Sequence, residues 1–201
     1  MFDGPDGVGK TSQIQLVADL LTREGYVIHI TRVHGGTPFG EKLREVSLSD
    51  TPRLPSTDLY LSHTMHIELA HDLHERKNKG EICLVDRSPA TMWSYQVRAS
   101  GLQEDFARPL IEKSFKLLSP DVLVIYLTSL HVLKQRMTER ANPKGDYFED
   151  QQDSFKEWTI IGYTEAAKMF DGKVIEASSS MQDVHGQTMK LIRPLLPKHE
   201  Q

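Results

Sequence analysis

The sequence predicts an α/β domain in which helices cover both faces of a parallel sheet. Apolar runs such as residues 122–127 are continuous rather than alternating, which is typical of strands buried on both faces. Segments with helical spacing separate these runs along the chain, as in successive β-α-β units. A glycine-rich stretch, residues 4–11, directly precedes the first of these helical segments. Ligands of such folds gather at the carboxyl ends of the strands.

The expected elements alternate along the chain. Ile14, Val17 and Leu21 predict a helix that begins after Thr11 and ends before Gly25. The expected strands after it cover residues 26–31, 82–86, 121–127 and 173–177. The expected helices after it cover residues 38–48, 56–79, 89–100, 103–118, 130–140, 149–170 and 181–195. Residues 48–56 and 141–148 are expected to form loops.

The first strand is expected to be truncated. Only Met1 and Phe2 precede Asp3, so a buried strand of about five residues does not fit before the glycine-rich stretch. Either the true start lies upstream, or the central strand is shortened. A shortened strand leaves backbone groups of its neighbours unpaired. We therefore expect this chain to melt at a lower temperature than a version extended upstream.

Length and composition indicate one globular domain, residues 1–201, with a lid segment at about 137–150. The net charge of −4 argues against a sequence-independent nucleic-acid binder, so no nucleic-acid partner is expected. No apolar run approaches the length of a membrane span, and no signal peptide is visible. Cys83 lies within an apolar run and is expected to be a buried thiol. These features favour a cytoplasmic protein with no membrane partner.

Residues 4–11 match the phosphate-binding pattern G-x-x-x-x-G-K-[ST]. Its glycines let the backbone curl so that successive N–H groups face phosphate oxygens, and the next helix adds its positive N-terminal end. Lys10 places a cation near the β- and γ-phosphates, and Thr11 offers a hydroxyl to Mg²⁺. The predicted nucleotide-binding residues are Gly4, Pro5, Asp6, Gly7, Val8, Gly9, Lys10 and Thr11.

Charged side chains follow two of the expected strands. Asp86 and Arg87 stand at the carboxyl end of the strand 82–86. Asp86 could hold a Mg²⁺-bound water and Arg87 could bind a phosphate oxygen, although a surface ion pair is the simpler alternative. Arg32 precedes a glycine turn, where it could bind a second anionic substrate or stand as an exposed cation.

Two arginines lie at the start of the expected lid. Arg136 and Arg140 lie four residues apart on one helical face, from which they could bring positive charge onto a transferring phosphoryl group. The chain therefore has candidates for two anion sites and a lid, as a phosphoryl-transfer enzyme requires. A GTPase-type switch is less well supported, because the nearest guanine motif, residues 78–81, ends in Glu and precedes its strand. A non-catalytic nucleotide-binding protein remains an alternative.

These motifs resemble the thymidylate kinase family of P-loop nucleoside monophosphate kinases over nearly the whole chain. Residues 31–44 read T-R-V-H-G-G-T-P-F-G-E-K-L-R and are similar to the family pattern T-R-E-P-G-G-T-P-L-G-E-x-I-R. Residues 2–11 resemble F-E-G-x-D-G-x-G-K-T. Residues 86–88 stand at the family's D-R-Y, residues 94–96 at its A-Y-Q, residues 146–149 at its D-R-[FI]-E and residues 162–163 at its G-Y.

The resemblance implies transfer of a phosphoryl group from ATP to dTMP, with Mg²⁺, in a homodimer. It implies that Asp6 meets the sugar 3′-hydroxyl and that Arg87 holds the acceptor phosphate, with Arg32 and Arg44 as further candidates. It also places Tyr95 and Gln96 among the substrate-binding residues. Position 7 is Gly rather than Arg, which is similar to the branch whose lid supplies catalytic arginines. The implied catalytic residues are Lys10, Arg87, Arg136 and Arg140, and the implied metal-site residues are Thr11 and Asp86.

The sequence departs from the family in the helix expected at residues 56–79. The family has F-A-A-D-R there, with Phe stacked on thymine and Arg bonded to its O4. Counting back from Asp86 without gaps puts Leu61 and Met65 at these positions. A shift in alignment could instead bring His63 or His66 to the O4-reading position. Another pyrimidine nucleotide as acceptor, or a catalytically weak homologue, therefore stays open beside dTMP.

Overall fold

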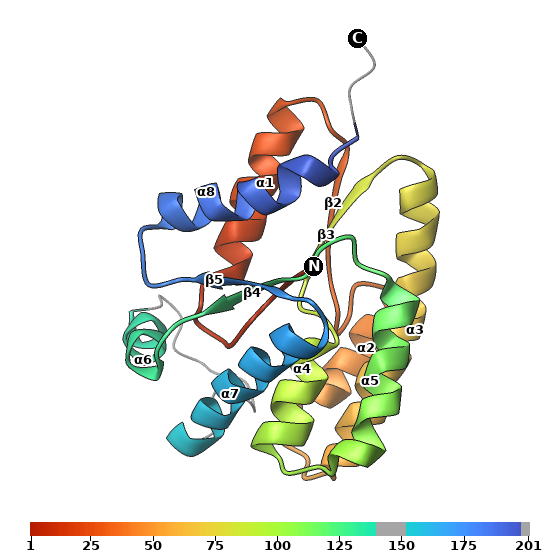
Figure 1. Cartoon of the computed structure of the whole chain (residues 1–201). Helices are drawn as coiled ribbons and strands as arrows, with labels where there is room; N and C mark the ends of the chain where they lie inside the picture. Colours follow the sequence, from red (N-terminus) through yellow and green to blue (C-terminus); the bar gives the residue numbers. More distant parts are fainter. Residues whose placement is uncertain (140–151, 198–201) are drawn as a thin grey trace.

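The computed structural model describes residues 1–139 and 152–197. Its five strands form one parallel sheet in the order β2-β3-β1-β4-β5, with helices on both faces (Figure 1). The strands are β1 Phe2–Asp3, β2 Ile28–Arg32, β3 Ile82–Asp86, β4 Val124–Leu127 and β5 Lys173–Glu176. The helices are α1 Lys10–Arg23, α2 Pro38–Ser47, α3 Pro55–Asn78, α4 Ala90–Met92, α5 Glu104–Leu118, α6 Leu130–Thr138, α7 Asp153–Met169 and α8 Met181–Ile192. The predicted fold class is confirmed.

Alternate residues of the central strands face two separate hydrophobic cores. Leu84 and Val124 pack with α1 and α8 on one face, whereas Val85 and Ile125 pack with α3, α5 and α7 on the other. Both faces of the sheet are therefore buried, which explains why these strands appear as continuous apolar runs in the sequence.

Strand β1 is only two residues long, as the sequence predicts, although it occupies the centre of the sheet. Phe2 pairs with Asp86 on one side and with Val124 on the other. Backbone hydrogen bonds continue at both ends, from the Arg87 N–H to Phe2 at 2.7 Å and from the Val124 N–H to Met1 at 2.9 Å. The lower stability expected for this arrangement stays a prediction.

The segment expected as one helix at residues 89–100 differs from the prediction. It consists of the short α4 followed by a π-helix, η1, at Trp93–Ala99. Helix α7 crosses η1 so closely that a Cβ on Gly162 would lie 2.5 Å from the Cα of Ser94. Only glycine allows this approach, so α7 and η1 are fixed against each other.

Helix ends follow local sequence signals. The hydroxyl of Thr37 accepts a hydrogen bond from the Gly40 N–H at 3.0 Å, and Pro38 occupies the first turn of α2. Ser129 and Ser180 cap α6 and α8 in the same way. A 3₁₀ turn, η2 at Arg193–Leu195, follows α8.

The lid expected at about 137–150 lies outside the described residues from position 140 onward and stays a prediction, as does the single-domain assignment. Among the described residues, no helix is long and apolar enough to cross a membrane.

Candidate active site

The glycine-rich loop joins the carboxyl end of β1 to the N-terminus of α1. A Cβ on Gly4 would lie 2.2 Å from the carbonyl oxygen of Tyr126, so the start of this loop requires glycine. The Nζ of Lys10 donates hydrogen bonds to the carbonyls of Gly4 at 2.8 Å and Pro5 at 3.0 Å. Burial, and then the nearby Arg87, lowers the pKa of Lys10. The loop thus encloses a buried cation at the end of a helix whose dipole favours anions.

Thr11 and Asp86 place two oxygens side by side at the edge of this loop. The Thr11 hydroxyl donates to the Asp86 carboxylate at 3.1 Å. In the described part of the chain, no group of three or more His, Cys, Asp or Glu side chains forms a metal cage. Two hard oxygens suit a Mg²⁺ ion, which usually keeps several waters and takes its other ligands from substrate phosphates.

Asp6 connects the loop to the neighbouring strand and helix. Its carboxylate accepts hydrogen bonds from the Tyr95 hydroxyl at 2.6 Å and from the guanidinium of Arg87, and lies 3.9 Å from Lys10 Nζ. Arg87 also donates to the Tyr163 hydroxyl at 3.1 Å, and its guanidinium lies over the Tyr95 ring. The Arg87 backbone has a φ of 72°, a conformation that is costly for a residue with a side chain and is often found at functional sites.

A second carboxylate, Asp3, is fully buried beneath the loop. It accepts hydrogen bonds from the Gly4 N–H, the Ser88 N–H and hydroxyl, and the Thr91 hydroxyl, at 2.6 to 3.1 Å. Burial raises the pKa of Asp3. Asp3 thereby ties the loop to the residues after β3. The sequence offers little signal for this role, and Asp3 was not predicted as a site residue.

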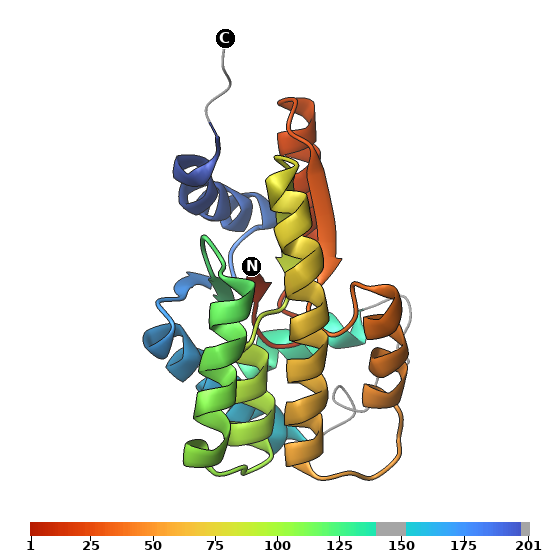
Figure 2. The same cartoon turned by 90° about the vertical axis from the view of Figure 1, so that its right-hand side faces the viewer.

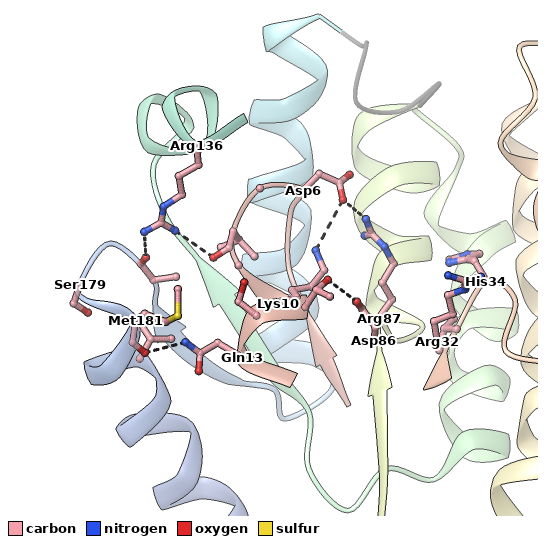
Figure 3. A pocket seen from close by; sticks show the side chains of 18 of the residues that line it. Asp6, Lys10, Gln13, Arg32, His34, Asp86, Arg87, Arg136, Ser179 and Met181 are labelled. Atoms are coloured by element: carbon pink, nitrogen blue, oxygen red, sulfur yellow. Dashed lines mark hydrogen bonds and ion pairs between the residues drawn. The ribbon is translucent and has the colours of Figure 1, made fainter. Parts of the chain in front are cut away.

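Two adjoining cavities open between these elements. The larger, of about 830 Å³, extends from Arg136 and Met181 past the loop to Arg32 and His34 (Figure 3). The smaller, of about 50 Å³, lies next to it. Asp6, His34, Arg44 and Arg87 line both. The volume of the larger cavity is typical of small-molecule sites. Several of the side chains that line this cavity are cations.

The thymidylate kinase family model matches residues 2–188. The chain belongs to the thymidylate kinase family. It is 30% identical to a thymidylate kinase of Caldanaerobacter subterraneus subsp. tengcongensis over 200 residues, which cover 97% of this chain and 94% of that protein. It is 29% identical to a thymidylate kinase of Exiguobacterium sibiricum over 203 residues, which cover 98% and 95% respectively.

Most of the site residues predicted from the sequence gather at the two cavities. Gly4 and Pro5 hold Lys10 through their carbonyls. Tyr95 and Gln96 line the smaller cavity. The predicted residues that line the larger cavity are Asp6, Gly7, Val8, Gly9, Lys10, Thr11, Arg32, Arg44, Asp86, Arg87 and Arg136.

The two residues predicted to contact the base in a thymidylate kinase lie elsewhere. Leu61 and Met65 line neither cavity, and Met65 is fully buried in the core. Helix α3 presents Ser62 to the smaller cavity. His66, one turn further on, lines neither cavity and is fully buried, as Met65 is. A role of Leu61 and Met65 in binding the base stays a prediction. No composition or spacing signal marks Ser62.

The predicted arginines differ in their surroundings. Arg32 forms a bidentate ion pair with Glu41 at the rim of the larger cavity. Its Nη2 lies 2.6 Å from Glu41 Oε2 and its Nε lies 3.2 Å from Glu41 Oε1. Arg44 donates to the His34 carbonyl at 2.9 Å. Arg136 donates to the carbonyls of Val8 at 3.2 Å and Ala177 at 2.7 Å, so it joins the loop to the end of β5. Arg140 lies outside the described residues, and its role stays a prediction.

Proposed function

We propose that this member of the thymidylate kinase family transfers the γ-phosphoryl group of ATP to dTMP and releases ADP and dTDP. One observation carries the proposal: a single cavity has the phosphate-binding loop in its wall and three further arginines, Arg32, Arg44 and Arg87, at one side. Two separate sets of phosphate-binding groups in one cavity suit a reaction between two phosphorylated substrates.

The side chains suit direct, in-line transfer. A phosphate oxygen of dTMP attacks the γ-phosphorus, and the bond from that phosphorus to the β–γ bridging oxygen breaks. Lys10 lies in the loop where it can neutralise charge on the β- and γ-phosphates. Arg87 is the best-positioned group to hold the acceptor phosphate, since it lies next to Lys10 and Asp6. No covalent enzyme intermediate is needed.

We further propose that Thr11 and Asp86 hold the Mg²⁺ that accompanies ATP. When bound, the ion would supply charge neutralisation at the β- and γ-phosphate oxygens. Two nearby protein oxygens and access to the cavity fit this ion.

We also propose a homodimer, formed through the outer faces of α3 and α5. These helices pack together on one side of the molecule (Figure 2). Three large apolar side chains are about half exposed there: Tyr60, Ile67 and Phe106. The rings of Tyr60 and Phe106 meet edge to face, with centroids 6.1 Å apart. Contiguous exposed apolar groups of this kind mark interaction surfaces. A cytoplasmic location stays a prediction.

The test is an ADP-release assay with ATP and Mg²⁺ against dTMP, with dGMP and dAMP as purine controls and dTDP identified as the product. Turnover of dTMP well above that of the purines supports the proposal. ATP binding without turnover of any nucleoside monophosphate would favour a non-catalytic nucleotide-binding homologue. Light scattering on the same sample tests the dimer, and Phe106→Glu is expected to give a monomer.

A further inference from the structure

The guanidinium of Arg87 bonds to side chains of opposite kinds, one charged and one neutral. Its Nη2 donates to the Asp6 carboxylate (Figure 3), and its Nη1 donates to the Tyr163 hydroxyl at 3.1 Å. Asp6 carries a negative charge with which an acceptor phosphate would compete. Tyr163 is uncharged, so it can keep its bond to Arg87 while a phosphate binds on the other nitrogen.

The Tyr163 hydroxyl belongs to a chain of hydrogen bonds that ends at Asp3. It lies 2.9 Å from the hydroxyl oxygen of Thr91, and the Thr91 hydroxyl donates to the Asp3 carboxylate at 3.1 Å. The three residues come from α7, α4 and β1, respectively. Asp3 and Tyr163 are fully buried, and Thr91 is nearly so. We call these residues the Tyr163–Thr91–Asp3 chain.

The chemistry of each group sets the direction of these bonds. Asp3 also receives two backbone N–H groups, which can only donate, so its oxygens act as acceptors. The Thr91 hydroxyl has one proton, and giving it to Asp3 leaves its oxygen to accept from Tyr163. Tyr163 thus gives its own proton to Thr91 and keeps its lone pairs for Arg87. Every bond in the chain points from the cation Arg87 toward Asp3.

A chain of this kind links the charge of Arg87 to that of Asp3. A hydroxyl that donates a hydrogen bond becomes a better acceptor for the next donor, and the low dielectric of a buried region strengthens each bond. Burial raises the pKa of Asp3, and the positive charge of Arg87 acts against that shift. Asp3 therefore serves as a remote counter-ion for Arg87, in addition to the direct partner Asp6.

The ring of Tyr163 is held in place independently of the cavities. It lies in the hydrophobic core that α7 shares with η1, where it meets the ring of Tyr95 edge to face at 6.3 Å between centroids. The preceding residue, Gly162, packs against the backbone of Ser94, which keeps α7 close to η1. The Tyr163 hydroxyl is therefore a fixed point of attachment for Arg87.

We propose that Tyr163 is a positioning residue for the acceptor phosphate. Its hydroxyl holds the Arg87 guanidinium in place while the phosphate displaces Asp6. The bonds to Thr91 and Asp3 orient that hydroxyl, so that it accepts from Arg87. Asp6 is thus the partner that exchanges, and Tyr163 is the partner that stays. The inference rests on the proposed kinase function.

The test is steady-state kinetics of Tyr163→Phe, with dTMP and ATP varied in turn. The substitution removes one oxygen and with it a hydrogen bond to a charged group, so we expect kcat/KM for dTMP to fall by about ten-fold or more. Most of this change is expected in the KM for dTMP, with the KM for ATP altered by less than about two-fold. A general loosening of the fold would not separate the two substrates in this way.

Tyr126→Phe is the matched control. Tyr126 is also a fully buried tyrosine, and its hydroxyl likewise lies 2.9 Å from a threonine hydroxyl, that of Thr188. It belongs to the hydrophobic core on the opposite face of the sheet. Its substitution removes a comparable buried hydrogen bond and is expected to leave the KM for dTMP within about two-fold of that of the parent protein.

Variants of Thr91 test whether the orientation of the Tyr163 hydroxyl matters. Thr91→Val keeps the shape of the side chain but removes its hydroxyl, and is expected to raise the KM for dTMP. Thr91→Ser keeps the hydroxyl and is expected to restore the parent value. Tyr163→Phe combined with Thr91→Val is expected to bind dTMP no worse than Tyr163→Phe alone, because the chain is already broken.

The outcomes separate the inference from the proposed function. A change in kcat/KM for dTMP below two-fold in Tyr163→Phe, equal increases in the KM for dTMP and ATP, or an equal effect of Tyr126→Phe overturns the inference and leaves the kinase function standing. If Tyr163→Phe does not fold, Thr91→Val against Thr91→Ser decides the matter, and equal KM values for dTMP overturn the inference. If the parent protein turns over no nucleoside monophosphate, the proposed function itself fails, and the inference fails with it.

Discussion

Tyr95 and Asp6 lie 89 positions apart in the sequence, and a hydrogen bond of 2.6 Å joins the Tyr95 hydroxyl to the Asp6 carboxylate. This bond links η1 to the phosphate-binding loop. The same carboxylate binds Arg87, so the cation best placed for an acceptor phosphate is already paired. If Arg87 holds the acceptor phosphate, as proposed above, that phosphate competes with Asp6 for Arg87, and we expect Tyr95 to hold Asp6 during the exchange.

Tyr95→Phe tests this arrangement. The variant keeps the ring beneath Arg87 but removes the bond to Asp6, so Asp6 remains on Arg87 and opposes the acceptor. We expect a loss of about 10- to 100-fold in kcat/KM for the acceptor, equivalent to about 1.4–2.7 kcal/mol. Steady-state kinetics with the acceptor varied would show it. A change below two-fold would mean that the bond has no part in binding or transfer.

Lys10→Ala is expected to reduce phosphoryl transfer by about 1,000-fold or more without unfolding the chain. The substitution removes the buried cation from the loop, where it can neutralise charge on the transferring group. Activity and thermal melting are measured on the same preparation. Lys77→Ala is the control, since Lys77 is an exposed lysine paired with Asp121, away from the cavities. Substantial turnover by Lys10→Ala would place the catalytic centre elsewhere.

Thr11→Ala is expected to raise the Mg²⁺ concentration required for half-maximal activity by about ten-fold, because one of the two proposed oxygen ligands is lost. A titration of activity with Mg²⁺ at a constant total concentration of ATP checks this. Thr164→Ala serves as the control, because the Thr164 hydroxyl donates to the Ile160 carbonyl within α7. Identical Mg²⁺ dependence in both variants would remove Thr11 from the proposed metal site.

Gly162→Ala is expected to lower the free energy of unfolding by about 1–3 kcal/mol, since the new methyl group would lie 2.5 Å from the Cα of Ser94. Gly186→Ala in α8 is the matched control. Apart from its own helix backbone and chain neighbours, no atom of the described residues lies within 4 Å of the Cβ it would add, and alanine favours the helix, so we expect a gain of about 0.5–1 kcal/mol. Urea denaturation separates the two. Equal effects would contradict the close crossing of α7 and η1.

The stability of the protein is expected to depend on pH through His66. Its pKa is far below 6.5 in the folded state, so below that pH protons bind preferentially to the unfolded chain and stability falls as the pH falls. His66→Leu removes this dependence. Between pH 7 and pH 5, the unfolding free energy of the variant relative to the parent should rise by about 2 kcal/mol. Asp3 has a raised pKa and acts in the opposite direction, but it is common to both proteins. A pH-independent difference would contradict the neutral, buried state of His66.

The fold follows largely from local patterns in the sequence. The bounds predicted for β3 agree with the structure, because a continuous apolar run ends sharply at Asp86. The π-helix η1 could not be predicted, since the apolar spacing of one short segment does not separate i→i−4 from i→i−5 hydrogen bonding. Asp3 was missed because a buried carboxylate is recognised only by the donors that surround it.

The face of α3 that meets the smaller cavity shows a different limit of prediction from sequence. Counting residues back from Asp86 gives distance along the chain, whereas the cavity selects a direction around the helix axis. Each residue turns the helix by about 100°, so a step of one position separates Leu61, which does not line the cavity, from Ser62, which does. A motif with fixed spacing, such as the phosphate-binding loop, does not suffer from this error.

The tight crossing of Gly162 over Ser94 has a consequence for the time course of local opening. Two helices that cannot separate without losing a backbone-to-backbone contact should exchange their amide hydrogens with deuterium in one cooperative step, with similar protection along both. Tyr95 and Gln96 belong to this step because η1 carries them. We therefore expect the packing of η1 against α7 to hold Tyr95 and Gln96 in place for the acceptor. The loop that would bind the donor contributes less to their rigidity.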